Sequence, residues 1–134
     1  MESPEVRRRT MQAVKSKDTA PELTVRRLAH GMGYRFRLHR KDLPGKPDLV
    51  FPRLHRALFV HGCFWHGHDC ARGARVPVRN RVYWTKKVAR NQERDKTAQA
   101  SLRTLGWRVL VLWECELKDS RRVGSRVKNF LEDE

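Results

Sequence analysis

The chain has 134 residues, of which 30 are lysine or arginine and 15 are aspartate or glutamate, so its formal net charge is +15. This length predicts a single domain, and a hydrophobic content of 39% supplies a small core, which argues against a disordered chain. The longest apolar runs, 57–60 and 109–113, are far shorter than the ~20 residues of a membrane span. The N-terminus lacks a secretory signal pattern, and three cysteines cannot all pair, so we expect an intracellular, soluble protein.

Helix-start and turn signals divide the first half of the chain. Ser3 followed by Pro4 predicts a helix start, and Thr19 with Glu22 three positions later predicts a capping box that opens a second helix. Gly31 and Gly33 close that helix. The alternation that follows predicts a strand with one buried face, made by Tyr34, Phe36 and Leu38.

The second half alternates strands with helices. A turn-rich loop, 41–47, leads to a short strand at 49–51, and the apolar run at 57–60 is typical of a buried strand. A long helix is predicted from about Arg81 to Leu105 and ends at Gly106. A strand at 107–113 and a helix with one apolar face follow, the face being Val123, Val127, Phe130 and Leu131. The order α-α-β-β-β-α-β-α predicts an α/β fold with a mixed central sheet flanked by helices.

The excess of positive charge predicts a polyanion, above all nucleic acid, as the partner. Of the 30 basic residues 21 are arginine, whose guanidinium matches phosphate oxygens. The complete absence of isoleucine suggests a compositional bias in the source genome, which is an alternative explanation for the high arginine content.

The segment HGCFWHGHDC, residues 61–70, predicts a metal site because it gathers thiols and imidazoles, the ligands that zinc prefers. A local ligand set would be Cys63, His66, His68 and Cys70. Cys115 is a further candidate ligand, in which case one histidine is left over. Cys115 is otherwise a small buried apolar residue.

Two aromatic residues, Phe64 and Trp65, stand between the candidate metal ligands. Bulky apolar side chains on a rigid loop are able to wedge between DNA bases, or they cap the core beneath the loop. The net charge favours the DNA interpretation.

Asp48 stands at the mouth of the strand at 49–51, near the end of the strand at 57–60. A carboxylate in that position is suited to Mg²⁺, which assists phosphodiester cleavage. A turn aspartate without a ligand is the alternative.

The stretches GKPDLVF, FVHGCFWHGHDC, NRVYWTKKVARNQERD and GWRVLVLWECEL resemble the very-short-patch-repair (Vsr) mismatch endonucleases, from about Met11 to Leu117. The resemblance implies a single restriction-endonuclease-like α/β domain over 1–134, of the PD-(D/E)xK superfamily, with 1–18 as a helical arm that contacts DNA. It further implies a bacterial, cytoplasmic monomer that nicks one strand of double-stranded DNA beside a T:G mismatch left by deamination of 5-methylcytosine. Catalytic Mg²⁺ and structural Zn²⁺ are the implied cofactors, and mismatch-repair proteins are candidate partners.

The resemblance also assigns roles to individual residues. Asp48 would bind Mg²⁺ together with the carbonyl of Val60, His66 would transfer protons, and Glu22 and His61 would support the site. Zinc would be held by Cys63, His68, Cys70 and Cys115. The DNA-contacting residues would be Met11, Phe64, Trp65, Trp84, Lys87 and Asn91.

The chain departs from the family pattern at Val60, where relatives usually carry threonine, so a hydroxyl is lost while the carbonyl is kept. Relatives can also carry further histidines where this chain has Gly67 and Asp69, but neither change removes a proposed ligand. The superfamily's E-x-K pair is absent, as the family pattern leads one to expect.

Other functions compatible with the charge and the metal cluster are a related nicking or restriction nuclease with another DNA target, a zinc-pinned DNA-binding module without catalysis, and a basic ribosomal protein. Asp48, Glu22 and the surplus His66 favour an enzyme, because a binding module has no use for that combination.

Overall fold

The computed structural model describes residues 19–70 and 79–132. The helix expected from Ser3, the arm at 1–18 and Met11 lie outside these residues. The described elements, in chain order, are α2 (Ala20–Gly31), β1 (Arg37–Leu38), β2 (Leu49–Phe51), the 3₁₀ turn η1 (Pro52–Leu54), β3 (Arg56–His61), α3 (Arg81–Thr104), β4 (Arg108–Trp113), the 3₁₀ turn η2 (Glu114–Lys118) and α4 (Ser120–Glu132).

The strands form one mixed, four-stranded sheet in the order β1-β2-β3-β4. β1, β2 and β3 are antiparallel neighbours, whereas β3 and β4 are parallel. The parallel register pairs His61 with Trp113 at the carboxyl ends of β3 and β4. Because β2 runs the other way, its amino end, next to Asp48, lies at that same edge of the sheet. Three chain segments therefore leave or enter the sheet at one edge.

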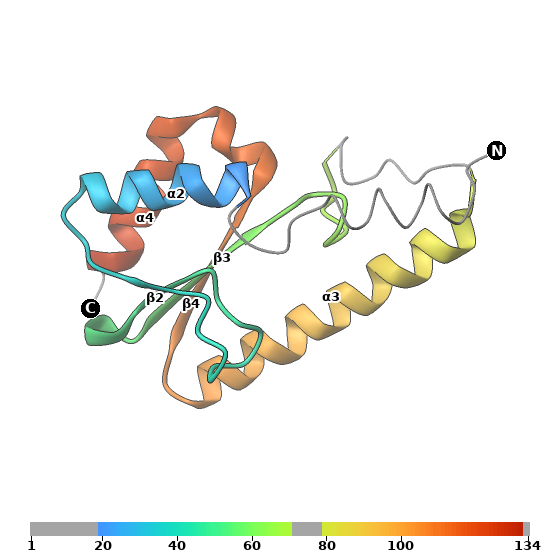
Figure 1. Cartoon of the computed structure of the whole chain (residues 1–134), viewed down its shortest axis with the longest axis horizontal. Coiled ribbons are helices and arrows are strands. Elements are labelled where there is room, and N and C mark those ends of the chain that lie inside the picture. Colours follow the sequence, from blue (N-terminus) through green and yellow to red (C-terminus); the bar gives the residue numbers. More distant parts are fainter. Residues whose placement is uncertain (1–18, 71–78, 133–134) are drawn as a thin grey trace.

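Helices cover both faces of the sheet, as the alternation of apolar side chains requires (Figure 1). α2 and α4 lie side by side on one face, where the larger core is made by Val25, Ala29, Leu49, Phe51, Leu58, Leu112, Val123, Val127 and Leu131. α3 covers the other face, where its Leu102 packs on Val50, Ala57 and Phe59. The result is the helix–sheet–helix arrangement that the sequence predicts.

The helix boundaries agree closely with the predictions. Thr19 caps α2 by accepting a hydrogen bond from the Glu22 N–H at 3.4 Å. α3 ends one residue before the predicted Leu105, and Gly106 follows with a φ of +91°, a conformation that favours glycine. In the described ranges, with 1–18, 71–78 and 133–134 left aside, no helix is long and apolar enough to cross a membrane.

The strand predicted over residues 34–38 is wrong in its extent. Only Arg37 and Leu38 pair with β2, and Leu38 is 40% exposed. Tyr34 and Phe36 precede the strand and instead pack edge to face against Phe51 at 6.3 and 5.9 Å between ring centroids. Aromatic packing, rather than backbone pairing, accounts for the alternation there.

The loop between β1 and β2 packs closely against α3. Gly45 has a φ of +76°, and a Cβ added to it would lie 2.7 Å from the Cβ of Ala98. No side chain fits between the loop and the helix at this point, so Gly45 allows the loop before Asp48 to lie directly on α3.

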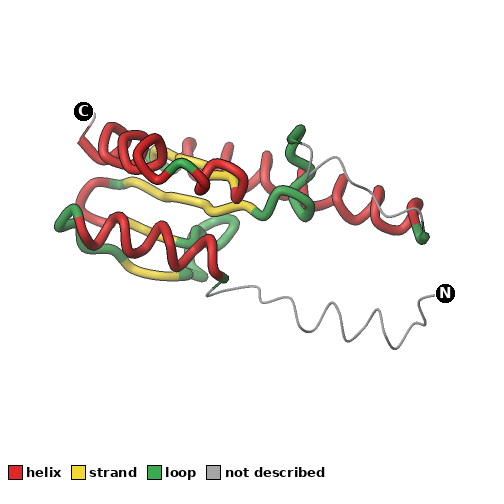
Figure 2. Tube along the Cα trace, turned by 90° about the horizontal axis from the view of Figure 1, so that it is seen from above, coloured by secondary structure: helices red, strands yellow, loops and turns green. Residues whose placement is uncertain are grey.

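α3 extends well beyond the sheet (Figures 1 and 2). Of its 24 residues only Trp84 and Leu102, near opposite ends, are buried. The turns between them lie beside the loop that follows β3, as hydrogen bonds from Asn91 and Gln92 to that loop show. α3 therefore contributes to the sheet edge described next as well as to the core.

Candidate active site

A cleft of about 890 Å³ lies at the sheet edge where β2 begins and β3 ends. It is lined by Asp48 and Val60 and also by His61, His66 and Asp95. Exposed cations, Lys41, Lys46 and Arg94, line the cleft as well. Strand ends position polar groups at a shared edge, the usual place for a site in a sheet flanked by helices.

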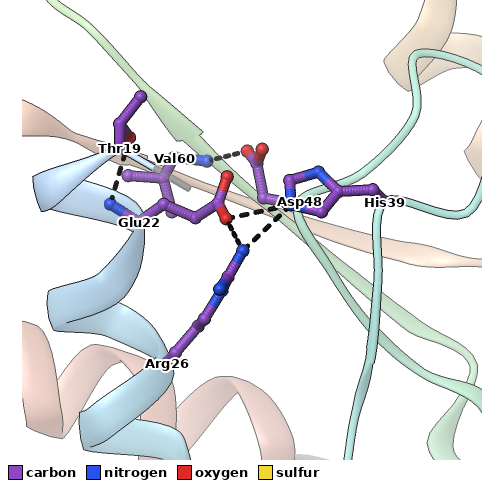
Figure 3. Close-up of polar contacts among 6 residues, drawn as sticks. All are labelled: Thr19, Glu22, Arg26, His39, Asp48 and Val60. Atoms are coloured by element: carbon purple, nitrogen blue, oxygen red, sulfur yellow. Dashed lines mark hydrogen bonds and ion pairs between the residues drawn. The ribbon is translucent and has the colours of Figure 1, made fainter. Parts of the chain in front are cut away.

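Asp48 is fixed by the backbone of β3. Its Oδ2 accepts a hydrogen bond from the Val60 N–H at 2.7 Å (Figure 3). Burial is the main cause that raises the pKa of this carboxyl to about 7, and the nearby Glu22 raises it further, whereas the Val60 N–H and Arg26 act in the opposite direction. Metal-free Asp48 therefore exchanges its proton near neutral pH.

Glu22 faces Asp48 from α2 and is only 2% exposed. Its Oε2 forms an ion pair with the guanidinium of Arg26, one helical turn later, and lies 3.0 Å from Nε2 of His39 (Figure 3). Ligand atoms of Glu22, His39 and Asp48 all lie within 4.8 Å of one another. The predicted Asp48 and Glu22 are thus together, with Arg26 and His39 as additional members.

A second group consists of two stacked imidazoles and a carboxylate. Nδ1 of His66 lies 2.6 Å from Oδ2 of Asp95, while Nε2 of His61 lies 3.9 Å from Oδ1 of the same side chain. The rings of His61 and His66 stack at 3.8 Å with an interplanar angle of 3°. Because a carboxylate only accepts, this contact assigns the proton to Nδ1 of His66 and leaves Nε2 available to a substrate.

His61 is a neutral residue in this group. Burial, followed by the proximity of His66, lowers the pKa of His61 to about 4, although Asp95 opposes the shift. Its Nδ1 has no hydrogen-bond partner among residues 19–70 and 79–132. His61 therefore supports His66 by stacking rather than as a charge at neutral pH.

The thiols meet because β3 and β4 are parallel. Cys63 and Cys115 each follow the paired His61 and Trp113 by two positions, so the register brings them together. The Cys115 N–H donates to Sγ of Cys63 at 3.3 Å, and Sγ of Cys115 lies 3.5 Å from Nδ1 of His68. Ligand atoms of Cys63, His68, Cys70 and Cys115 lie within 4.8 Å of one another, while His66 points to Asp95.

This Cys₃His set has the chemistry of a structural zinc site. Burial raises the pKa of Cys63 to about 12, so a cation has to displace the proton of this thiol. Trp113 stacks on the ring of His68 at 4.2 Å and fixes its orientation. The local alternative, with His66 in place of Cys115, does not correspond to this arrangement.

The aromatic residues singled out in the sequence form one cluster. Ring centroids of Phe64, Trp65 and Trp84 are 5.1 to 5.6 Å apart, in edge-to-face pairs. Trp84 is 8% exposed, whereas Phe64 and Trp65 are half-buried on the loop. Trp84 therefore supports the other two from α3.

Lys87 and Asn91 lie one turn apart on α3, beside this loop. The Asn91 side-chain amide donates to the Trp65 carbonyl at 2.8 Å, so it holds the loop in place. Lys87 is half-buried.

Sequence reasoning missed Asp95, Arg26 and His39. A sequence signal for Asp95 exists, since it follows Asn91 by four positions and so shares its helix face. Arg26 likewise follows Glu22 by four positions. His39 could not be placed, because its backbone has a φ of +51° that no pattern in the loop predicts.

A buried carboxylate and a histidine–carboxylate pair that share a cation-lined cleft of an α/β domain are the groups of a nuclease. The family profile described as "DNA mismatch endonuclease Vsr" matches residues 1–72. The chain is 54% identical over 130 residues to "Type II nicking enzyme V.XorIIP" of Xanthomonas oryzae pv. oryzae, covering 97% of this chain and 95% of that protein. It is 39% identical over 117 residues to "DNA mismatch endonuclease Vsr" of Escherichia coli (strain K12), covering 87% and 74%.

The chain belongs to the Vsr family of DNA mismatch endonucleases, and it is an endonuclease. This membership confirms the family resemblance and the restriction-endonuclease-like α/β fold expected from the sequence.

Proposed function

We propose that the chain nicks one strand of double-stranded DNA beside a T:G mismatch, with Mg²⁺ as the catalytic ion and Zn²⁺ as a structural ion. The observation that carries the proposal is the shared cleft of Asp48 and the His66–Asp95 pair. The loop that bears His66 also bears Phe64 and Trp65, so DNA held by these aromatic side chains lies next to the catalytic groups.

The residues around Asp48 fit Mg²⁺, which prefers carboxylate and carbonyl oxygens. Since the N–H and C=O of a strand residue point to the same side, the Val60 carbonyl faces the Asp48 side of β3. Mg²⁺ at Asp48 and this carbonyl would supply charge stabilisation for the phosphate oxygens. The valine side chain contributes no hydroxyl, so the backbone provides the second ligand.

His66 is the proton-transfer residue in this proposal. Asp95 accepts a hydrogen bond from Nδ1–H and orients the ring, so that Nε2 takes a proton from the attacking water. The water oxygen forms a bond to phosphorus while one P–O ester bond breaks, and the departing sugar oxygen takes up a proton from solvent. The products are one phosphate end and one hydroxyl end, so the strand is cut once.

The Cys₃His site has a positional role. Cys63, His68 and Cys70 lie on the loop after β3, and Cys115 anchors this loop to the end of β4. Zinc at these residues would hold His66 and the aromatic pair at the mouth of the cleft.

The remaining assignments concern DNA contacts. We propose Phe64 and Trp65, backed by Trp84, as the wedge at the mismatch, and Lys87 and Asn91 as readers of the mismatched pair. Phe64 and Trp65 are only half-buried and lie on the same loop as His66, which supports the wedge. Met11, on the proposed 1–18 arm of a single monomeric 1–134 domain, would enter from the opposite groove. Mismatch-repair proteins remain candidate partners.

The test is a nicking assay on end-labelled duplexes that differ only in one T:G or T:A pair, in Mg²⁺, read on a denaturing gel. We expect a single cut in the labelled T strand of the T:G duplex and an intact complementary strand. Asp48→Asn is the matched inactive control. Equal cutting of the T:A duplex would contradict the mismatch preference while leaving the nuclease assignment intact.

A nicking endonuclease for another DNA target is the second candidate. The relative with 54% identity, V.XorIIP, bears the name of a type II nicking enzyme. A panel of all mismatches in several flanking contexts separates the candidates, because a T:G enzyme cuts T:G duplexes alone.

A further inference from the structure

Arg26 lies where a cation would lie if Glu22 and His39 were metal ligands. We propose that the Arg26 guanidinium is a resident cation of the active site, which occupies the corner between Glu22 and His39 and so leaves Asp48 as the only side-chain ligand of the divalent ion. The inference rests on the proposed function and adds a separate role for each carboxylate: Asp48 binds the divalent ion, and Glu22 pairs with Arg26.

The contacts of the guanidinium support this assignment. Nη2 of Arg26 pairs with Oε2 of Glu22 and lies 3.0 Å from Nε2 of His39, and these two atoms are themselves 3.0 Å apart (Figure 3). Glu22 and His39 are two of the three residues whose ligand atoms lie close enough together to hold a metal, the third being Asp48. A set of one imidazole and two carboxylates would suit a transition metal. The guanidinium instead saturates two of the three groups with a charge that no pH removes.

The ion pair between Glu22 and Arg26 is largely removed from solvent. Glu22 is 2% exposed and the Arg26 side chain 17%, so the carboxylate requires a compensating charge inside the protein. Arg26 follows Glu22 by one helical turn of α2, which places both side chains on one face of the helix, beside His39, whereas the adjacent Arg27 is exposed. His39 is held in the corner by its own backbone, whose N–H donates to the Asp48 carbonyl at 3.3 Å.

A fixed cation reduces the repulsion between the carboxylates of Glu22 and Asp48. Two buried carboxylates that face each other repel, and one cation near both reduces that repulsion. Arg26 acts on Asp48 as well as on Glu22, since it lowers the pKa of Asp48 while Glu22 raises it. β3 carries no lysine that could supply such a charge at this edge. Arg26, from α2, therefore provides it.

The experiment measures Mn²⁺ binding to the full chain, with the Cys₃His site filled beforehand with Zn²⁺, from the loss of the free Mn²⁺ electron paramagnetic resonance signal at pH 8. For the unmodified chain we expect one Mn²⁺, lost in Asp48→Asn and retained in Glu22→Gln, where the uncompensated Arg26 charge weakens its binding by up to about tenfold. Arg26→Gln removes the charge and frees Glu22, so its Mn²⁺ affinity should rise about tenfold. The double variant with Glu22→Gln should lose that gain.

Arg26→Lys and Arg27→Gln are the matched controls. Lysine keeps the charge and should leave Mn²⁺ affinity near that of the unmodified chain, as should Arg27→Gln, which alters a neighbouring exposed arginine. If Arg26→Gln does not fold, Arg26→Lys replaces it in the test. The double variant Arg26→Lys with Glu22→Gln should then still bind one Mn²⁺. Thermal melts establish folding for each variant.

Two results would overturn the inference without touching the proposed function: loss of Mn²⁺ in Glu22→Gln alone, or unchanged or weaker binding in folded Arg26→Gln. Failure of Asp48→Asn to reduce Mn²⁺ binding would remove the proposed metal site itself, and this inference with it.

Discussion

If Asp48 binds Mg²⁺ as proposed, a proton and the divalent cation compete for its carboxylate. Because burial raises the pKa of this carboxyl to about 7, its ionised fraction increases as pH rises from 6 to 8. We predict that the Mg²⁺ concentration for half-maximal nicking falls about tenfold over that interval. Initial nicking rates across Mg²⁺ titrations at fixed ionic strength measure it. A requirement independent of pH would place the ion elsewhere.

Asp48→Asn keeps the hydrogen bond from Val60 and removes the charge. Nicking should fall by about a thousandfold, since metal stabilisation contributes several kcal/mol to phosphodiester cleavage. Duplex affinity should be equal or higher, because one negative charge facing the phosphate is gone. Gel assays and fluorescence anisotropy on the same T:G duplex separate the two effects. Near wild-type nicking by this variant would contradict the role of Asp48.

Asp95 determines which nitrogen of His66 carries the proton. Asp95→Asn places an amide that can donate to Nδ1, which shifts the proton to Nε2 and removes the base. We predict about a hundredfold loss of nicking, with zinc content and duplex affinity unchanged. Glu93→Gln, an exposed carboxylate on the same helix, is the control and should retain full activity. Unaltered nicking in Asp95→Asn would show that His66 does not act through this pair.

The residues differ in how far the sequence predicts them. The segment 61–70 leaves one candidate histidine over when Cys115 is a zinc ligand, and the family resemblance assigns this histidine as His66. Asp48 is identified by its place before a strand. Their partners, Asp95 for His66 and Arg26 for Glu22 beside Asp48, lie on helices that carry no motif pointing to a site. Only the packing of α2 and α3 against the sheet shows that these two side chains belong to the active site.

At the scale of elements, the parallel pairing of β3 and β4 brings the Cys₃His residues of two chain segments together at the proposed zinc site. Cys115→Ser should lose zinc and lower the free energy of unfolding by about 3 kcal/mol, because metal binding contributes directly to folding. Elemental analysis and denaturant unfolding check this. His66→Ala should keep its zinc and lose nicking. The opposite pattern, with zinc lost in His66→Ala and kept in Cys115→Ser, would favour the local ligand set of 61–70.

The elements that periodicity predicts best are those buried on a whole face. α4 shows it clearly, since Val123, Val127 and Leu131 are all buried as the spacing indicates. β1 shows the limit. Leu38 alternates with Tyr34 and Phe36 in sequence, but it lies at an uncovered edge of the sheet, and alternation alone does not say how many residues pair there.

At the scale of the whole molecule, the charge of +15 predicts steep salt dependence. Lys46 and Arg94 line the cleft and are exposed, so we expect each to contact phosphate. Replacing either by alanine should reduce the slope of log affinity against log salt by about one, with little change in mismatch preference. Anisotropy titrations between low and physiological salt measure the slope. DNA affinity that does not change over this range of salt would contradict the proposed phosphate contacts of Lys46 and Arg94.

The close approach of Gly45 to Ala98 has a consequence for how DNA is recognised. The loop before Asp48 lies so close to the helix that carries Asp95 that no Cβ fits at residue 45, and from this close packing we expect the two sides of the cleft to keep a constant separation. Distortion on binding then falls mainly on the duplex rather than on the protein. Unstacking a mismatched pair costs less free energy than unstacking a matched one. If the chain acts on mismatches as proposed, a rigid cleft would therefore give selectivity for a mismatched pair, even where no side chain contacts a base.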